Sequence, residues 1–285
     1  MMTSLKKTGV YALLIMLCLL AVGPFLWLLS TALKSSDENI FSAIPQLLPQ
    51  TPTLDNFAEV LKKIPMLRYV ANSLIVTGLT VVLNLVFSVL AAYPLARMRF
   101  FGQKAMILTV LATMMIPFQV IMVPLYLIVL KMGLVDSNPD LFGPVANGWL
   151  GLVLPFAISG FGIFFVQQAL VSLPKELEEC AMLDGCNSFQ ILTRVLLPLI
   201  GPTLATLAVF TFMSAWGEFL WPSIVQSEPD QFLLPLGLIQ LQGTFSANWR
   251  LIAAGTILSM LPILAFFLLL QRYFVSGSLG GSVKG

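Results

Sequence analysis

The chain has 285 residues, of which 58% are hydrophobic and only 10% charged, and its mean hydropathy is +0.93. Soluble domains carry about 25% charged residues, so the composition excludes a soluble protein and indicates a polytopic membrane protein embedded in a lipid bilayer. A net charge of +2 without a dense basic patch excludes a nucleic-acid-binding protein. Because the chain has no histidine, it lacks the commonest metal ligand and the commonest general base.

Six segments are long and apolar enough to cross a bilayer as helices, which takes about 20 residues each. The sequence therefore predicts an all-α membrane protein with one transmembrane domain over residues 1–285 and six spans. These spans cover about 11–32, 70–94, 105–130, 149–170, 199–225 and 251–273.

The distribution of lysine and arginine predicts that both termini lie in the cytoplasm. In that orientation the cytoplasmic segments carry nine of the 15 cations and the external segments carry six, as the positive-inside rule requires. The short segment ARMRFFGQK, with Arg97, Arg99 and Lys104, gives the clearest signal. Prolines in or beside the last four spans predict kinks, which fit either a bundle that lines a pathway or ordinary irregular packing.

A charged segment over 172–198 interrupts the apolar sequence between the fourth and fifth spans. Ser172 can cap a first helix, and Pro174 is tolerated in its first turn. Three glutamates follow where negative charge suits the helix dipole, and Gly185 is expected to end this helix. Asn187 or Ser188 can start a second helix, with an apolar stripe formed by Phe189, Leu192, Val195 and Leu196.

This helical hairpin is expected to lie in the cytoplasm. Its first helix has a surface of small residues, Cys180, Ala181 and Gly185, which allows close approach of another protein's backbone. The alternative is a helix that rests on the lipid surface, which three glutamates oppose, because membrane surfaces are anionic.

The hairpin sequence EECAMLDGCNSFQILTRVLLP resembles the EAA motif in the membrane subunits of binding-protein-dependent ATP-binding-cassette importers. Cys180 stands where alanine is usual, and Val195 where isoleucine is. Further stretches, including WGEFLWP and the ending GGSVKG, are similar to the carbohydrate branch of that family, the maltose-, trehalose- and glycerol-3-phosphate-type permeases. The residues that match the motif or stand in it are Glu179, Cys180, Ala181, Asp184, Gly185, Val195, Leu197 and Pro198.

The resemblance implies an importer permease fold in a bacterial inner membrane, with the hairpin as a coupling helix that docks on a cytoplasmic ATPase. It also implies the partners: a second homologous permease, two ATPase subunits that bind ATP and Mg, and an extracytoplasmic solute-binding protein. The C-terminal residues Gly280, Gly281, Ser282 and Lys284 resemble a tail that reaches toward the ATPase pair, although a frayed terminus is an equal alternative.

One acidic residue, Glu218, lies inside a predicted span, where burial in lipid is costly. Trp216 and Trp221 flank it, and a carboxylate beside indole rings can hold a sugar through its hydroxyl groups and C–H faces. An interfacial tryptophan belt with an outward-pointing acid is the alternative. Asn84 and Gln119 are further candidates for lining the substrate pathway, and interhelical hydrogen bonds explain them as well.

No phosphate-binding loop of the GxxxxGK[ST] type occurs in the sequence, so the chain is expected to be a non-catalytic subunit that holds no cofactor of its own. The predicted function is transport of a sugar, oligosaccharide or polyol by an ATP-driven importer. A secondary transporter or channel is the alternative, but such proteins usually show several intramembrane ionisable groups or paired broken helices. An intramembrane enzyme is disfavoured, because no nucleophile–base or metal set is present.

Overall fold

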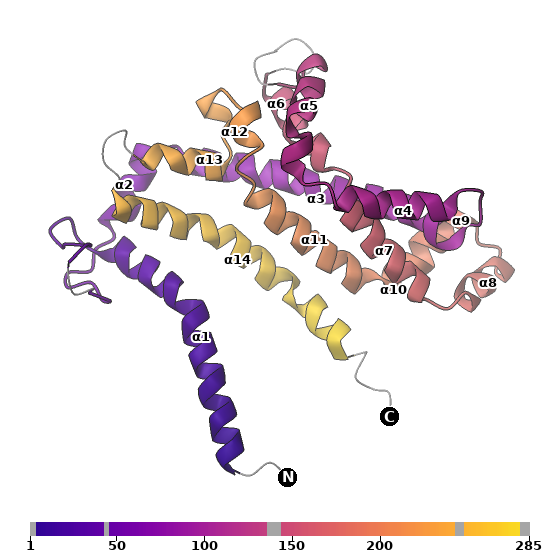
Figure 1. Ribbon diagram of the computed structural model, residues 1–285, viewed down its shortest axis with the longest axis horizontal. Coiled ribbons are helices and arrows are strands. Elements are labelled where there is room, and N and C mark those ends of the chain that lie inside the picture. Colours follow the sequence, from indigo (N-terminus) through magenta and orange to yellow (C-terminus); the bar gives the residue numbers. More distant parts are fainter. Residues whose placement is uncertain (1–3, 43–45, 136–143, 243–247, 280–285) are drawn as a thin grey trace. The chain divides into compact units, whose positions relative to one another are not determined.

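The computed structural model describes residues 4–42, 46–135, 144–242 and 248–279, and this part of the chain contains helices and turns but no strand. The prediction of an all-α protein is confirmed. Figure 1 shows the α-helices in chain order from indigo to yellow. They are α1 (Ser4–Leu33), α2 (Asp55–Lys63), α3 (Met66–Arg97), α4 (Gln103–Met114), α5 (Phe118–Lys131), α6 (Pro144–Val153), α7 (Gly160–Ser172), α8 (Glu176–Leu183), α9 (Ser188–Gln190), α10 (Leu197–Leu199), α11 (Gly201–Trp216), α12 (Pro222–Val225), α13 (Leu234–Leu238) and α14 (Trp249–Leu279).

Short segments of tighter or wider helix join some of these elements. They are the 3₁₀ turns η1 (Leu154–Phe156), η3 (Pro229–Gln231) and η4 (Ile239–Leu241), and the π-helical segment η2 (Ile191–Leu196).

Helices occur in all six predicted membrane segments, but only three of them are continuous over the length of a span. The continuous ones are Gly9–Leu33, Met66–Arg97 and Trp249–Leu269. The other three spans are pairs of helices with a bend between them. Six spans result when each bent pair counts as one.

The bends occur at residues that cannot continue a regular helix. The third span turns by 99° between α4 and α5 (Figure 1), where Pro117 has an extended backbone. The fourth bends by 46° after η1, which contains Pro155, and the fifth bends by 77° beside Pro202. A proline lacks the N–H that the helix ladder needs and clashes with the preceding turn.

The fifth span differs from the predicted range 199–225. Helix α11 ends at Trp216, because Gly217 forms its C-cap and a turn follows, and the chain resumes only as the short helix α12. The apolar stretch continues through residue 225, but hydropathy alone does not mark where a helix ends.

The chain divides into two compact units, Met1–Leu67 with Gly237–Leu261, and Arg68–Leu236 with Pro262–Gly285. In the first unit α1 packs against α2. The buried Asn56 of α2 donates from Nδ2 to the carbonyl oxygens of Ala32 and Lys34, at 2.8 Å each. These bonds satisfy carbonyl groups that the end of α1 leaves without a helical partner.

The segment after α1 is organised around the carboxylate of Glu38. It accepts hydrogen bonds from the backbone N–H groups of Thr51, at 2.9 Å, and Gln50, at 3.1 Å. The Thr51 hydroxyl also donates to it at 3.0 Å. These bonds, above all the one from the Thr51 backbone, hold the pKa of Glu38 down at about 2, because they favour the charged form.

In the second unit a buried cluster forms around Trp221, with Val76, Leu134, Leu152 and Val225 among its members. The Trp221 side chain is fully buried, and its Nε1 donates to the carbonyl oxygen of Gly151 at 3.0 Å. Gly151 lies against the backbone of Leu134, where an added Cβ would come within 2.1 Å of the carbonyl oxygen. Only glycine allows α6 to approach this closely.

The variant Gly151→Ala is therefore expected to destabilise the protein by about 1–3 kcal/mol, as overpacking of a close contact does. Gly78→Ala is the matched control, because a Cβ at Gly78 in α3 meets nothing within 4 Å, and alanine favours a helix more than glycine does. Thermal unfolding in detergent checks this. Equal midpoints for the two variants would contradict the close packing of α6.

Candidate functional site

The hairpin between α7 and α11 has a defined turn at Gly185. Its first helix, α8, ends with the hydrogen bonds of a Schellman motif: Gly185 N–H donates to the Met182 carbonyl, and Cys186 N–H donates to the Ala181 carbonyl, both at 3.0 Å. Gly185 has φ +83°, a conformation that favours glycine. The prediction that Gly185 ends this helix is confirmed.

The start of α8 lies later than predicted. Helix α7 runs through Ser172, whose hydroxyl donates to the Ala169 carbonyl at 2.7 Å. Ser172 therefore belongs to the end of α7 and does not cap α8, which begins at Glu176 after Lys175 in the capping position. The expectation for Ser172 was wrong because the helical pattern of α7 continues into the polar residues.

The second half of the hairpin starts at Asn187, as predicted. Its side chain accepts from Gln190 N–H, and the Gln190 side chain accepts from Asn187 N–H, each at 2.9 Å, which forms a capping box. Of the predicted stripe, Leu192 and Leu196 are buried, but Phe189 is 70% exposed. The π-helical segment η2 shifts the register, so Ile191 faces the core instead.

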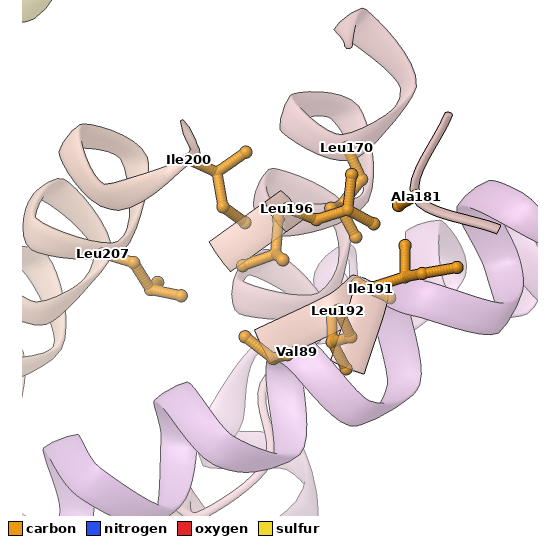
Figure 2. Close-up of a cluster of buried hydrophobic side chains, with 10 residues drawn as sticks. Val89, Leu170, Ala181, Ile191, Leu192, Leu196, Ile200 and Leu207 are labelled. Atoms are coloured by element: carbon orange, nitrogen blue, oxygen red, sulfur yellow. The ribbon is translucent and has the colours of Figure 1, made fainter. Parts of the chain in front are cut away.

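A buried apolar cluster holds the hairpin against α3, α7 and α11, and Figure 2 shows its side chains. Ala181 of α8 and Ile191, Leu192 and Leu196 of η2 contribute, together with Val89 of α3, Leu170 of α7 and, beyond the hairpin, Ile200 and Leu207. The hairpin therefore packs on the helices as a defined unit.

The predicted docking surface of small residues needs a correction at Ala181. This side chain is 7% exposed and lies inside the cluster, so it supports the hairpin from within. The large apolar side chains that the hairpin exposes most are Leu183, at 89%, Phe189 and Met182, and Leu177 is exposed to a smaller extent. Of the other predicted coupling residues, Val195 and Leu197 pack against the cluster, whereas Glu179, Cys180, Asp184, Gly185 and Pro198 are exposed.

An ion pair that the sequence did not predict joins α8 to α3. Arg97 Nε lies 2.6 Å from Glu178 Oε1, with side chains 5% and 14% exposed. Arg97 also donates from Nη2 to the carbonyl oxygen of Leu173, after the last turn of α7, at 3.0 Å. No short motif reveals such a pair, because the residues are 81 positions apart and each charge has a local explanation.

A second candidate feature is an open cavity of about 540 Å³ between α3, the bend before α7, and α11. Its walls combine aromatic residues with small polar ones and one acid. They are formed by Thr80, Asn84, Pro155, Phe156, Ile158, Ser159, Phe161, Phe210, Thr211, Ser214, Ala215 and Glu218.

Asn84 links three elements of this cavity. Its Nδ2 donates to the Phe156 carbonyl at 3.0 Å and to Ser159 Oγ at 3.1 Å, and its Oδ1 accepts from the Thr211 hydroxyl of α11 at 3.4 Å. Gly162 makes this approach possible, since an added Cβ would lie 2.9 Å from Asn84 Oδ1. Asn84 thus satisfies the backbone at the bend of the fourth span.

The structure separates the predicted substrate-pathway residues. Glu218 lines the cavity with Asn84, and one of its carboxylate oxygens accepts from Trp221 N–H at 3.1 Å. Trp216 is 3% exposed and stacks on Phe212, and Trp221 is buried in its own cluster, so neither indole lines this cavity. Gln119 is exposed on α5, outside the cavity lining. The predicted tail residues 280–282 and 284 lie outside the described part of the chain.

Comparison with a protein-family model matches residues 68–278 to the family described as "Binding-protein-dependent transport system inner membrane component". The chain is 35% identical over 268 residues to the arabinooligosaccharides transport system permease protein AraQ of Halalkalibacterium halodurans, covering 93% of this chain and 92% of the relative. It is 36% identical over 264 residues to the diacetylchitobiose uptake system permease protein DasC of Streptomyces coelicolor, covering 93% and 92%.

Among solved structures, the chain is similar to a subunit of a bacterial ABC transporter involved in the import of the acidic polysaccharide alginate. The TM-score is 0.80 at 23% identity, over 96% of this chain and 99% of the other. A chain of the inward-facing methionine transporter MetNI gives a TM-score of 0.55 at 18% identity, over 74% and 95%. These similarities establish a shared fold.

Proposed function

Since the chain belongs to the family of binding-protein-dependent transport system inner membrane components, we propose that it is the membrane subunit of an ATP-driven importer for a sugar, oligosaccharide or polyol. An external solute-binding protein delivers the substrate. Two relatives named for arabinooligosaccharide and diacetylchitobiose uptake match over more than nine-tenths of this chain, which supports a carbohydrate substrate. A separate subunit hydrolyses the ATP.

The complete complex contains a second homologous permease and two ATPase subunits, which bind ATP with Mg. Residues 1–285 form one permease domain with six spans, and both termini lie in the cytoplasm. The loop with Arg97, Arg99 and Lys104 supports this orientation, and Arg97 contacts Glu178 of the hairpin. The C-terminal residues Gly280, Gly281, Ser282 and Lys284 are proposed to contact the ATPase pair.

The hairpin is the observation that carries this proposal. A loop that merely connects two spans does not need a capping box, a Schellman motif and a buried core of its own. A rigid lever does need them, because a force applied at its tip must reach the helices beneath without being absorbed by local bending. The partner ATPase can bind an apolar surface formed by the exposed side chains of Leu183, Met182 and Phe189.

Within the bundle, the cavity around Glu218 and Asn84 is the proposed part of the substrate pathway in this subunit. Its carboxylate and hydroxyl groups can hydrogen-bond to sugar hydroxyls, while Phe156, Phe161 and Phe210 provide apolar faces for the C–H groups. Trp216 and Trp221 pack inside the helical core, so they are not proposed to touch the substrate in this cavity.

Reconstitution in vesicles tests the function. The full complex is expected to take up a labelled arabino-oligosaccharide or diacetylchitobiose only with ATP on the cytoplasmic side and the binding protein on the other. The chain by itself is expected to move neither sugar. Sugar movement by the isolated chain without ATP would contradict the proposal and favour a secondary transporter or channel.

Replacement of Gly185 tests the docking role of the hairpin. Gly185→Val is expected to lower transport per ATP hydrolysed at least tenfold while membrane insertion persists, because a side chain is added where the ATPase approaches. Gly102→Val is the matched control: Gly102 also has a positive φ, +85°, and also has open space around it. Both variants carry a similar backbone strain of about 1–2 kcal/mol, but the control keeps normal coupling. Uptake and ATPase rates measured in the same vesicles give the transport per ATP hydrolysed. A normal value in Gly185→Val would count against the docking role.

Substitution of Glu218 tests the substrate pathway. Glu218→Ala removes the acceptor and is expected to slow uptake at least tenfold at low substrate concentration, whereas Glu218→Gln, which keeps an acceptor oxygen, is expected to slow it about threefold. Glu59→Gln, at an exposed position of α2, should leave uptake unchanged. The effect is measured from initial uptake rates at several concentrations of the sugar-loaded binding protein. Wild-type rates in both Glu218 variants would exclude Glu218 from the substrate pathway.

A further inference from the structure

Arg97 and Glu178 form a buried bridge between the hairpin and a helix that is not adjacent to it in the chain. The chain joins the hairpin directly to the fourth and fifth spans, through α7 and η2, whereas α3 is the second span. The two charged atoms lie 2.6 Å apart, and both side chains are largely withdrawn from solvent. Arg97 also binds the Leu173 carbonyl, so one guanidinium fixes the ends of α3 and α7 to the first turn of α8.

We propose that the Arg97–Glu178 pair transmits the movement of the coupling hairpin to α3, and that α3 conveys it to the substrate cavity. This inference rests on the proposed function. Glu178 and Arg97 act here as positioning residues: neither touches substrate, and their role is to keep the hairpin and α3 in one rigid body.

The continuity of α3 makes this route physically direct. Asn84 precedes Arg97 by 13 residues on the same helix, which is about 20 Å at 1.5 Å per residue. Asn84 holds the Phe156 carbonyl and Ser159 at the bend of the fourth span, and it accepts from Thr211 of α11. A shift or rotation of α3 therefore acts on the two other walls of the cavity at once.

The character of the pair suits a mechanical joint. The apolar side chains of the cluster that holds the hairpin can slide over one another at little cost. A buried ion pair cannot, because separation leaves a desolvated charge without a partner. The pair therefore fixes the register between α8 and α3, which an apolar cluster alone does not do.

The chain offers a matched control pair. Arg68 and Asp230 also form an ion pair across distant parts of the sequence, but their side chains are 55% and 80% exposed. Exposed ion pairs contribute little to stability. Arg68→Gln therefore removes an ion pair of the same chemistry but leaves the buried Arg97–Glu178 pair intact.

The first experiment measures sugar uptake and ATPase activity of the complete complex in vesicles. Arg97→Gln and Glu178→Gln are each expected to reduce transport per ATP at least tenfold while ATPase activity stimulated by the binding protein stays within twofold of wild type. The exchange variant R97E/E178R should recover at least threefold over either single variant. Recovery stays partial because a carboxylate at position 97 cannot donate to the Leu173 carbonyl. Arg68→Gln should change the amount of sugar transported per ATP hydrolysed by less than twofold.

A second experiment tests the joint without relying on transport. Spin labels at Glu176→Cys of α8 and Leu90→Cys of α3, both exposed positions outside the proposed docking surface, report the distance between the hairpin and α3 in a background without the native cysteines. The distance should stay constant between the nucleotide-free and ATP-bound complexes of the wild type, and it should change between these states in Arg97→Gln.

The outcomes separate the two proposals. If the wild-type complex carries no sugar, the proposed function fails. If the wild-type complex carries sugar but the single variants couple transport to ATP hydrolysis normally, the transmission role fails. It also fails if the distance between the labels in the wild type changes between nucleotide states. Loss of ATPase activity in proportion to transport, together with failed assembly, would overturn it as well, since the pair would then only stabilise the fold.

Discussion

The hydrogen bond from Asn84 to the Phe156 carbonyl is the interaction on which the arrangement of the second unit depends. A span that bends leaves backbone groups without helical partners, and lipid offers none. At the bend of the fourth span, Asn84 of α3 supplies the missing donor and Ser159 caps the helix that follows. The bend thereby becomes a fixed feature, and the largely apolar cavity with its few polar groups lies beside it.

Glycines allow these polar contacts to form at short range. Gly162 leaves space for Asn84, Ser88 and Ser159, and Gly160 brings α7 against the backbone of α4. Small residues are the usual means by which membrane helices approach one another. In this chain their positions coincide with the bend of the fourth span, so the same residues set the packing of the helices and the shape of the cavity.

The sequence carried the local features of the fold and missed the long-range ones. Gly185 and Asn187 were predictable because a left-handed glycine and a capping box are encoded within a few residues. The six apolar segments were predictable from their length and their kinks from the prolines, although the size of the turn at Pro117 and the end of α11 at Gly217 were not. Ala181 shared a helical face with exposed residues, and only the packing of η2 against it reveals its burial.

The candidate site was also predictable only in part. Glu218 and Asn84 were identified because they are polar residues inside apolar segments, and both line one cavity. Trp216 and Trp221 flank Glu218 in the chain, yet a helix end and a turn direct both indoles into apolar packing. The partnership of Arg97 with Glu178 has no local signature, since it depends on where the end of α3 meets α8.

The polar groups of the cavity are unequally available to a ligand. Asn84, Ser159 and Thr211 hydrogen-bond to one another and to the backbone of the bend, so the fold already uses much of their capacity. Glu218, the only acid within a predicted span, uses one carboxylate oxygen for the Trp221 N–H. In the proposed substrate pathway, selectivity would therefore rest more on Glu218 and on the aromatic walls than on the buried amide. Under the same proposal, changes at these lining positions would alter the substrate while the Asn84 network, α3 and the hairpin stay intact.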